Sequence, residues 1–147
     1  MPDPNIIESE DALAEIVRAM RTVAVVGMQD EKRADRPAHA IPRMLQERGL
    51  TIIPINPTIS SALGISALKS VAELDRRVDV VDVFRRADAI PALADEILSL
   101  PADRRPGVVW LQSGIRNDAA AEKLAAQGIR VVQDRCLGVY AARYLKA

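Results

Sequence analysis

Short runs of β-branched residues alternate with longer amphipathic segments along this chain of 147 residues, and this alternation restricts the fold more than any other feature. Five runs have the length and composition of buried strands: residues 22–27, 50–55, 78–84, 107–111 and 129–133. The other segments have the spacing of helices: residues 10–20, 37–48, 70–75, 87–98, 117–127 and 140–145. Strands that alternate with helices through short connections predict an α/β fold, a doubly wound three-layer sandwich around a five-stranded, mainly parallel sheet.

The length fits one domain, residues 1–147, with its core at about residues 20–137. The 20 basic and 20 acidic side chains give a formal net charge of zero, which argues against a general nucleic-acid binder. The longest apolar runs are only as long as strands, and the N-terminal segment lacks a basic region followed by an apolar core. We therefore expect a cytoplasmic protein with no membrane span and no signal peptide.

In a doubly wound sheet, ligands bind outside the carboxyl ends of the strands. The residues directly after each predicted strand are therefore the candidates for a site. They are Gly27-Met28-Gln29, Asn56-Pro57-Thr58, Phe84-Arg85-Arg86, Gln112-Ser113-Gly114 and Asp134-Arg135-Cys136.

The loop after the first strand, residues 28–36, is longer than most such connections. It follows Gly27 and leads into a predicted helix, whose free N–H groups favour an anion. Lys32, Arg33 and Arg36 add positive charge, so a phosphate or pyrophosphate is one interpretation. The other is a solvated surface loop, because three carboxylates neutralise this charge locally: Asp30, Glu31 and Asp35.

Two further patterns limit the choice of ligand. The three-glycine dinucleotide fingerprint is absent, and Asn56-Pro57 stands where an acidic residue would hold a ribose, so NAD is disfavoured. Arg85 and Arg86 suit phosphate. However, six arginines fall at the opposite edge of the sheet, so arginines alone do not select the ligand edge: Arg21, Arg76, Arg77, Arg104, Arg105 and Arg130.

With one cysteine and one histidine, an internal disulfide is impossible and a metal site is not expected. Cys136 is most simply interpreted as a half-buried structural residue. The alternative is a reactive thiol, because Arg135 beside it would favour the thiolate. His39 is expected at the surface or in helix capping, and Trp110 in the core.

Two aspartates interrupt the predicted third strand, which is unusual for a central strand. Asp82, near its carboxyl end, is a candidate to face a site. Asp79, near its start, is expected to be solvated.

The strand ends carry a resemblance that covers residues from about Thr22 to Cys136. The residues that carry it are Val25-Val26-Gly27, Arg36-Pro37, Pro54-Ile55-Asn56-Pro57, Gly64, Val78-Asp79-Val80-Val81-Asp82-Val83-Phe84-Arg85-Arg86, Trp110-Leu111-Gln112-Ser113-Gly114, Asn117 and Asp134-Arg135-Cys136. In their order and spacing the chain resembles the small stand-alone CoA-binding proteins, relatives of the CoA-binding domain of the succinyl-CoA synthetase α subunit.

The resemblance implies a Rossmann-like fold with coenzyme A or an acyl-CoA as ligand. It implies a pyrophosphate at residues 27–30, adenosine near residues 56–58, and residues 84–86 along the cofactor. The cofactor-binding residues expected on both grounds are Gly27, Met28, Gln29, Asp30, Arg33, Arg36, Asn56, Pro57, Thr58, Phe84, Arg85, Arg86, Gln112 and Gly114.

The chain departs from the family pattern in two places. Met28-Gln29 replaces the usual small or hydroxylated pair, which leaves backbone N–H donors for the phosphate, and the acid usual after the cysteine is missing. No catalytic constellation is evident, and the chain has neither the length nor the histidine of the synthetases. A binding module is therefore expected, with two alternatives: a thiol-dependent enzyme or redox protein that uses Cys136, or an interaction module with a vestigial nucleotide site.

Overall fold

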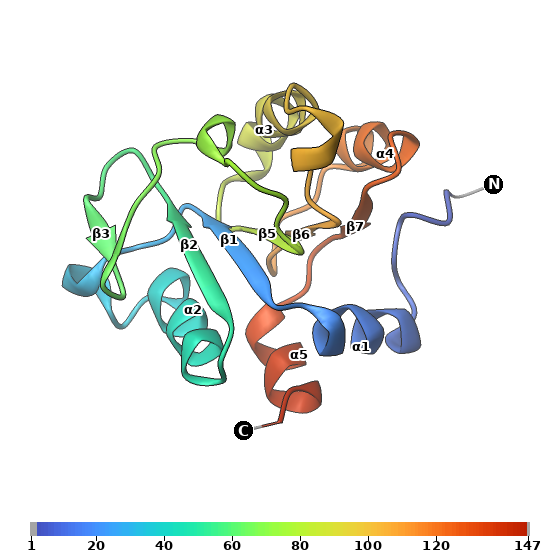
Figure 1. The fold of residues 1–147 in the computed structure, drawn as a ribbon. Helices are drawn as coiled ribbons and strands as arrows, with labels where there is room; N and C mark the ends of the chain where they lie inside the picture. Colours follow the sequence, from blue (N-terminus) through green and yellow to red (C-terminus); the bar gives the residue numbers. More distant parts are fainter. Residues whose placement is uncertain (1–2, 147) are drawn as a thin grey trace.

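A computed structural model describes residues 3–146 and shows a central sheet between two layers of helices (Figure 1). The five strands are all parallel, in the order β2-β1-β5-β6-β7. This confirms the predicted α/β class, and each predicted strand lies within two residues of its observed bounds. The bounds are Thr22–Val26 for β1, Thr51–Ile55 for β2, Val80–Val83 for β5, Val108–Leu111 for β6 and Arg130–Val132 for β7.

Side chains of the central strand β1 alternate between two buried cores, because successive residues of a strand point to opposite faces. Val23 and Val25 belong to one core, and Ala24 and Val26 to the other. All four are buried, which explains why this strand reads as a continuous apolar run rather than as an alternating one.

The helices divide between the two faces of the sheet (Figure 1). One face is covered by α1 (Glu10–Ala19), α2 (Pro37–Glu47) and α5 (Leu137–Tyr144), and the other by α3 (Ile90–Leu98) and α4 (Asp118–Ala126). Single 3-10 turns, η1 (Glu31–Arg33), η2 (Val71–Glu73), η3 (Ala87–Ala89) and η4 (Ala102–Arg104), lie in the connections. Ser9 and Asn117 cap α1 and α4, as their side-chain chemistry predicts.

Three details differ from the sequence-based expectation. A small antiparallel hairpin, β3 (Ser61–Ala62) with β4 (Ile65–Ser66), lies in the connection after β2, and the helix expected at 70–75 is only η2. The last helix starts at Leu137 rather than at residue 140. Gly138 lies inside this helix, and the absence of a side chain lets α5 approach α2. A Cβ at Gly138 would lie 2.9 Å from Cγ1 of Ile41.

Within residues 3–146, no helix is long and apolar enough to cross a membrane.

Candidate functional site

The carboxyl ends of β1 and β5 meet at Gly27, which has a φ of +82°. A Cβ at this position would lie 2.3 Å from the main-chain oxygen of Phe84. Only glycine combines this conformation with this close approach. Gly27 therefore brings the loop after β1 against residues 84 and 85, which follow β5.

Two main-chain amides at the start of the loop after β1 already have partners in β2 and α2. The amides of Gly27 and Gln29 donate to the carbonyls of Ile55 (2.8 Å) and Ala38 (3.1 Å). The amides of Met28, Asp30 and Ala38 have no acceptor within the described chain. The anion cradle expected after Gly27 is thus smaller than the loop length suggests, although it is not closed.

Side chains in the loop also have structural partners. Met28 is fully buried, so only its main chain is left for a ligand. The carboxylate of Asp30 accepts the Lys32 amide (3.1 Å) and caps η1.

Asn56, directly after β2, connects two loops. Its amide nitrogen donates to the carbonyl of Met28 (2.9 Å), and its side-chain oxygen accepts from the amide (2.9 Å) and hydroxyl (2.7 Å) of Thr58. These bonds use both ends of the side chain. Asn56 therefore holds the loops after β1 and β2 in one arrangement.

Two pockets open at this edge of the sheet, one lined in part by Phe84 and the other by Arg85. The first, the loop pocket, has a volume of about 240 Å³ and is lined by Gln29, Arg33, Arg36, Pro37, Ala38 and Phe84. The second, the sheet-edge pocket, has a volume of about 230 Å³ and is lined by Val26, Ile55, Pro57, Lys69, Ser70, Val71, Arg85, Ala89, Ala92, Leu93 and Glu96. The structure thus brings six predicted site residues into pockets: Gln29, Arg33, Arg36, Pro57, Phe84 and Arg85.

Both pockets are cationic. Arg33 and Arg36 line the loop pocket, and Lys69 and Arg85 line the sheet-edge pocket. Within residues 3–146, none of these four forms an ion pair. The one carboxylate in the lining, Glu96, accepts the amide of Val71 (3.1 Å). Such unpaired cations beside apolar walls suit a ligand that carries phosphates and a nonpolar part.

The sequence profile of a family described as "CoA binding domain" matches residues 21–142. The chain belongs to this CoA-binding domain family. A curated relative, the uncharacterized protein YneT of Bacillus subtilis (strain 168), is 39% identical over 131 residues, which cover 89% of this chain and 93% of the relative.

Solved structures share the fold of this chain. The structure of cell-free ID.343 from Thermus thermophilus has 37% identity and a TM-score of 0.83, and the match covers 93% of this chain and 99% of that one. The dinucleotide-forming acetyl-coenzyme A synthetase 1 of Ca. Korarchaeum cryptofilum shares the fold, with 21% identity and a TM-score of 0.65. That match covers 81% of this chain and 27% of the synthetase.

Eight predicted site residues of this CoA-binding domain line neither pocket: Gly27, Met28, Asp30, Asn56, Thr58, Arg86, Gln112 and Gly114. Arg86 extends into solvent beside Asp88 (3.2 Å), with 88% of its side chain exposed. The amide of Gly114 donates to the carboxylate of Asp134 (2.6 Å). Gln112 is buried, and its side-chain oxygen accepts the Leu137 amide (3.3 Å) at the start of α5.

Asp82 lines neither pocket, although the sequence made it a candidate to face a site. It is fully buried; its Oδ1 accepts from Gln112 (2.5 Å), and its Oδ2 has no partner within the described residues. Burial raises its pKa to about 7, although the bond from Gln112 opposes this shift. The pair belongs to the interior of the sheet, beneath α5.

His39 is also placed differently from the expectation. It is 2% exposed, not at the surface, and its Nε2 lies 2.5 Å from Oε2 of Glu31. The same carboxylate oxygen accepts the amide of Leu63 (3.0 Å) in the β3–β4 hairpin. Glu31 therefore holds the loop after β1 to α2 and to the hairpin.

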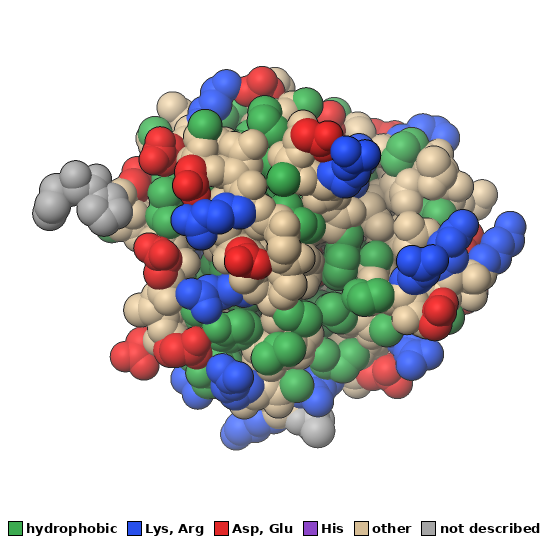
Figure 2. Space-filling model, turned by 180° about the vertical axis from the view of Figure 1, so that it is seen from behind, with side chains coloured by type: hydrophobic (Ala, Val, Ile, Leu, Met, Phe, Trp, Pro, Cys, Tyr) green, Lys and Arg blue, Asp and Glu red, His purple; other side chains and the backbone are tan. Residues whose placement is uncertain are grey.

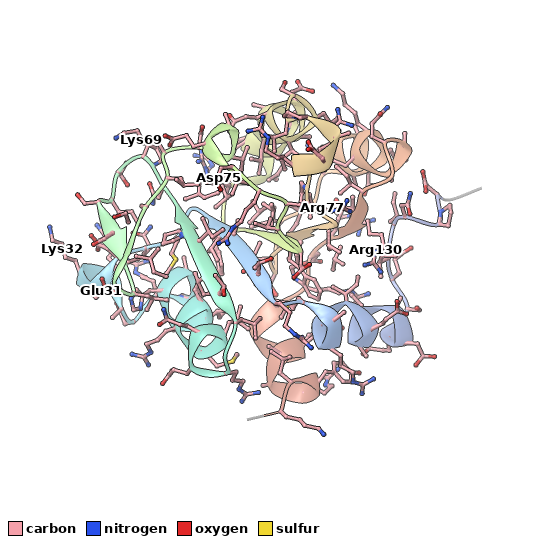
Figure 3. The ribbon with its side chains drawn as sticks, in the orientation of Figure 1. Glu31, Lys32, Lys69, Asp75, Arg77 and Arg130 are labelled. Carbon is pink, nitrogen blue, oxygen red and sulfur yellow. The ribbon has the colours of Figure 1, made fainter. Side chains whose placement is uncertain are left out.

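The residues missed from the sequence include three from the connection after β2, Lys69, Ser70 and Val71, and four from η3 and α3, Ala89, Ala92, Leu93 and Glu96. Leu68 pairs with Ile55 in an isolated bridge, and its main chain bonds to those of Pro54 and Asn56. This return along β2 carries Lys69 to the carboxyl edge (Figure 3). A single isolated bridge leaves no alternation of apolar and polar residues in the sequence, so no sequence signal identified Lys69.

Proposed function

We propose that this CoA-binding domain binds coenzyme A, free or acylated, across the carboxyl ends of β1, β2 and β5. The observation that carries the proposal is the set of four cations without carboxylate partners, two in each pocket: Arg33, Arg36, Lys69 and Arg85. Coenzyme A carries a diphosphate and a separate ribose phosphate, so its site needs cationic groups in two places.

In this proposal the diphosphate lies at the loop pocket, where Arg33 and Arg36 stand near the free amides of Asp30 and Ala38. The adenosine lies at the sheet-edge pocket. Val26, Ile55 and Leu93 supply apolar contact for the base there.

The proposal assigns no bond-making step. Cys136 is half-buried at the start of α5 and lines neither pocket. The alternative, a thiol-dependent enzyme or redox protein, predicts that Cys136→Ser abolishes turnover or mixed-disulfide formation. Our proposal predicts that the same variant binds coenzyme A as the wild type does.

The proposed partner is a small molecule rather than a nucleic acid. On the face that Figure 2 shows, Lys and Arg side chains lie among Asp and Glu, with hydrophobic side chains between them. A surface that follows a phosphate backbone would gather its basic residues in one stripe.

Titration calorimetry with coenzyme A, acetyl-CoA, ATP and NAD tests the proposal. Coenzyme A should bind more tightly than NAD, and Arg36→Gln should raise its Kd by about tenfold or more, because a charge-assisted contact is lost. The matched control is Arg43→Gln, on the same helix, where Arg43 pairs with Glu47 (3.7 Å) outside both pockets. No heat with millimolar coenzyme A, together with binding of NAD, would contradict the proposal.

A further inference from the structure

The six arginines at the amino edge of the sheet differ in what their side chains contact. The guanidinium groups of Arg21, Arg104 and Arg105 donate to main-chain carbonyls at or just beyond helix ends. Those of Arg77 and Arg130 have neither a carbonyl nor a carboxylate partner within residues 3–146. Three of the six arginines are thus used by the fold. Arg76 also lacks a side-chain partner within residues 3–146, but it lines a different pocket, so Arg77 and Arg130 remain as a pair.

These two arginines line one cavity. It has a volume of about 180 Å³, lies at the opposite edge of the sheet from the proposed CoA site, and is called here the amino-edge pocket. In Figure 3, Arg77 and Arg130 are labelled in the right half of the view, far from Lys32 and Lys69 in the left half.

Gly107 lines the pocket with both arginines and contacts each of them differently. A Cβ on it would lie 3.9 Å from Nη2 of Arg77, and its carbonyl accepts the main-chain amide of Arg130 (3.2 Å). The missing side chain therefore leaves open the space beside the Arg77 guanidinium.

The carboxylate in this pocket, Asp79, does not neutralise them. Its Oδ2 accepts from the amides of Arg21 (2.8 Å) and Thr22 (3.0 Å) and from the Thr22 hydroxyl (3.2 Å). It forms no ion pair with either Arg77 or Arg130. Two guanidinium groups and one engaged carboxylate leave the pocket with a net positive charge.

We propose that the amino-edge pocket is a second ligand site, in which Arg77 and Arg130 bind the oxyanion of a small phosphorylated or carboxylated molecule. Guanidinium forks suit both kinds of oxyanion. A short carbon chain of the ligand would contact the apolar residues of the lining, Ile16, Met20, Val80 and Val108. The site is independent of coenzyme A binding at the other edge.

Amide NMR titrations of the full chain with inorganic phosphate and, separately, with sodium butyrate test this site. At least one probe should shift the amides of Gly107, Val108 and Arg130 and reach saturation. A phosphate-bearing ligand predicts that phosphate is the tighter probe, and a carboxylate with a carbon chain predicts butyrate. Arg77→Gln and Arg130→Gln should each raise the Kd by about fivefold or more.

Arg76→Gln is the matched control, because it removes the same charge from the adjacent residue, which lines a different pocket. Its Kd should equal that of the wild type. The proposal is wrong if neither probe gives a saturable shift at these amides, or if Arg76→Gln weakens binding as much as Arg77→Gln does.

Gly107→Ala tests the space beside the Arg77 guanidinium without changing charge. The new Cβ would lie 3.3 Å from the main-chain oxygen of Asp79, a tight contact that a shift of a few tenths of an ångström relieves. We expect a folded protein, with calorimetry showing unchanged coenzyme A binding, whose Kd for the better probe rises by about threefold or more. An unchanged Kd in this folded variant would contradict the arrangement.

Discussion

The imidazole of His39 and the carboxylate of Glu31 lie 2.5 Å apart and join helix α2 to the loop after β1. The histidine is 2% exposed, whereas 58% of the glutamate side chain is exposed, so a carboxylate at the surface contacts a buried imidazole ring. The Leu63 amide binds the same oxygen (3.0 Å). One carboxylate thus fixes three segments at the rim of the proposed site.

Glu31→Ala should destabilise the fold by about 1–3 kcal/mol, because both ring nitrogens of buried His39 would then lack partners. The hydrogen bonds from His39 and the Leu63 amide lower the pKa of Glu31 below its ordinary 4.5. The contribution is therefore fully present above that value and is lost as the pH falls through the lowered one. Urea unfolding from pH 7 down to pH 3 measures both effects.

Glu47→Ala is the control for this variant, because its ion pair with Arg43 is exposed on both sides. It should cost less than about 0.5 kcal/mol. Equal losses in the two variants would show that the His39–Glu31 contact contributes no more than an ordinary surface pair.

Gly27→Ala should cost about 3 kcal/mol or more, because the new Cβ would lie 2.3 Å from the main-chain oxygen of Phe84. Gly64→Ala is matched to it, since Gly64 also has a positive φ, +77°, but has open space around it. The backbone conformation alone should cost about 1 kcal/mol. Thermal unfolding of the two variants compares them, and similar losses would mean that the close approach of β5 to β1 is not tight.

The layered fold could be predicted because it depends on patterns within single segments. The run at Thr22–Val26 and the caps at Ser9 and Asn117 need no distant partner to be recognised. Trp110 is likewise buried, as predicted. The β3–β4 hairpin escaped prediction because strands of two residues carry no alternation.

The candidate site was predicted only in part, because its residues depend on contacts between distant segments. Position after a strand suggested Phe84 and Arg85, and each of them lines a pocket. The same rule suggested Gln112, which folds inward because Asp82, thirty residues away, accepts its amide. Nothing in the local sequence distinguishes these two outcomes.

Asn56→Ala should raise the Kd for coenzyme A by about tenfold, because the loops after β1 and β2 would lose the side chain that joins them. Thr58→Val removes only the hydroxyl contact to Asn56 and keeps the bond to Met28, so it should change the Kd by less than about threefold. Calorimetry measures both. If Asn56→Ala binds as the wild type does, the joined loops are not needed for the site.

Asp79 and Asp82, three residues apart at β5, should respond to pH in opposite directions. Burial opposes ionisation of Asp79, but bonds from the Thr22 and Arg21 amides outweigh it and lower its pKa below 3.8. Its contribution to stability is therefore fully present above pH 3.8 and is lost as the pH falls through the lowered pKa. Asp79→Asn should accordingly weaken the fold at pH 7, and by less once the pH falls through the lowered pKa.

Asp82 has the reverse sign, because its pKa in the folded protein is about 7, against 3.8 as the ordinary value. The folded chain holds a proton that the unfolded chain releases between these values, so the contribution is full below pH 3.8 and is lost as the pH rises towards 7. The slope approaches about 1.4 kcal/mol per pH unit. Asp82→Asn removes this slope, and should gain stability on the wild type between pH 5 and pH 8 by up to about 4 kcal/mol. Urea unfolding of both proteins at pH 5, 6.5 and 8 measures the difference, and parallel curves would show that Asp82 is ionised in the fold throughout.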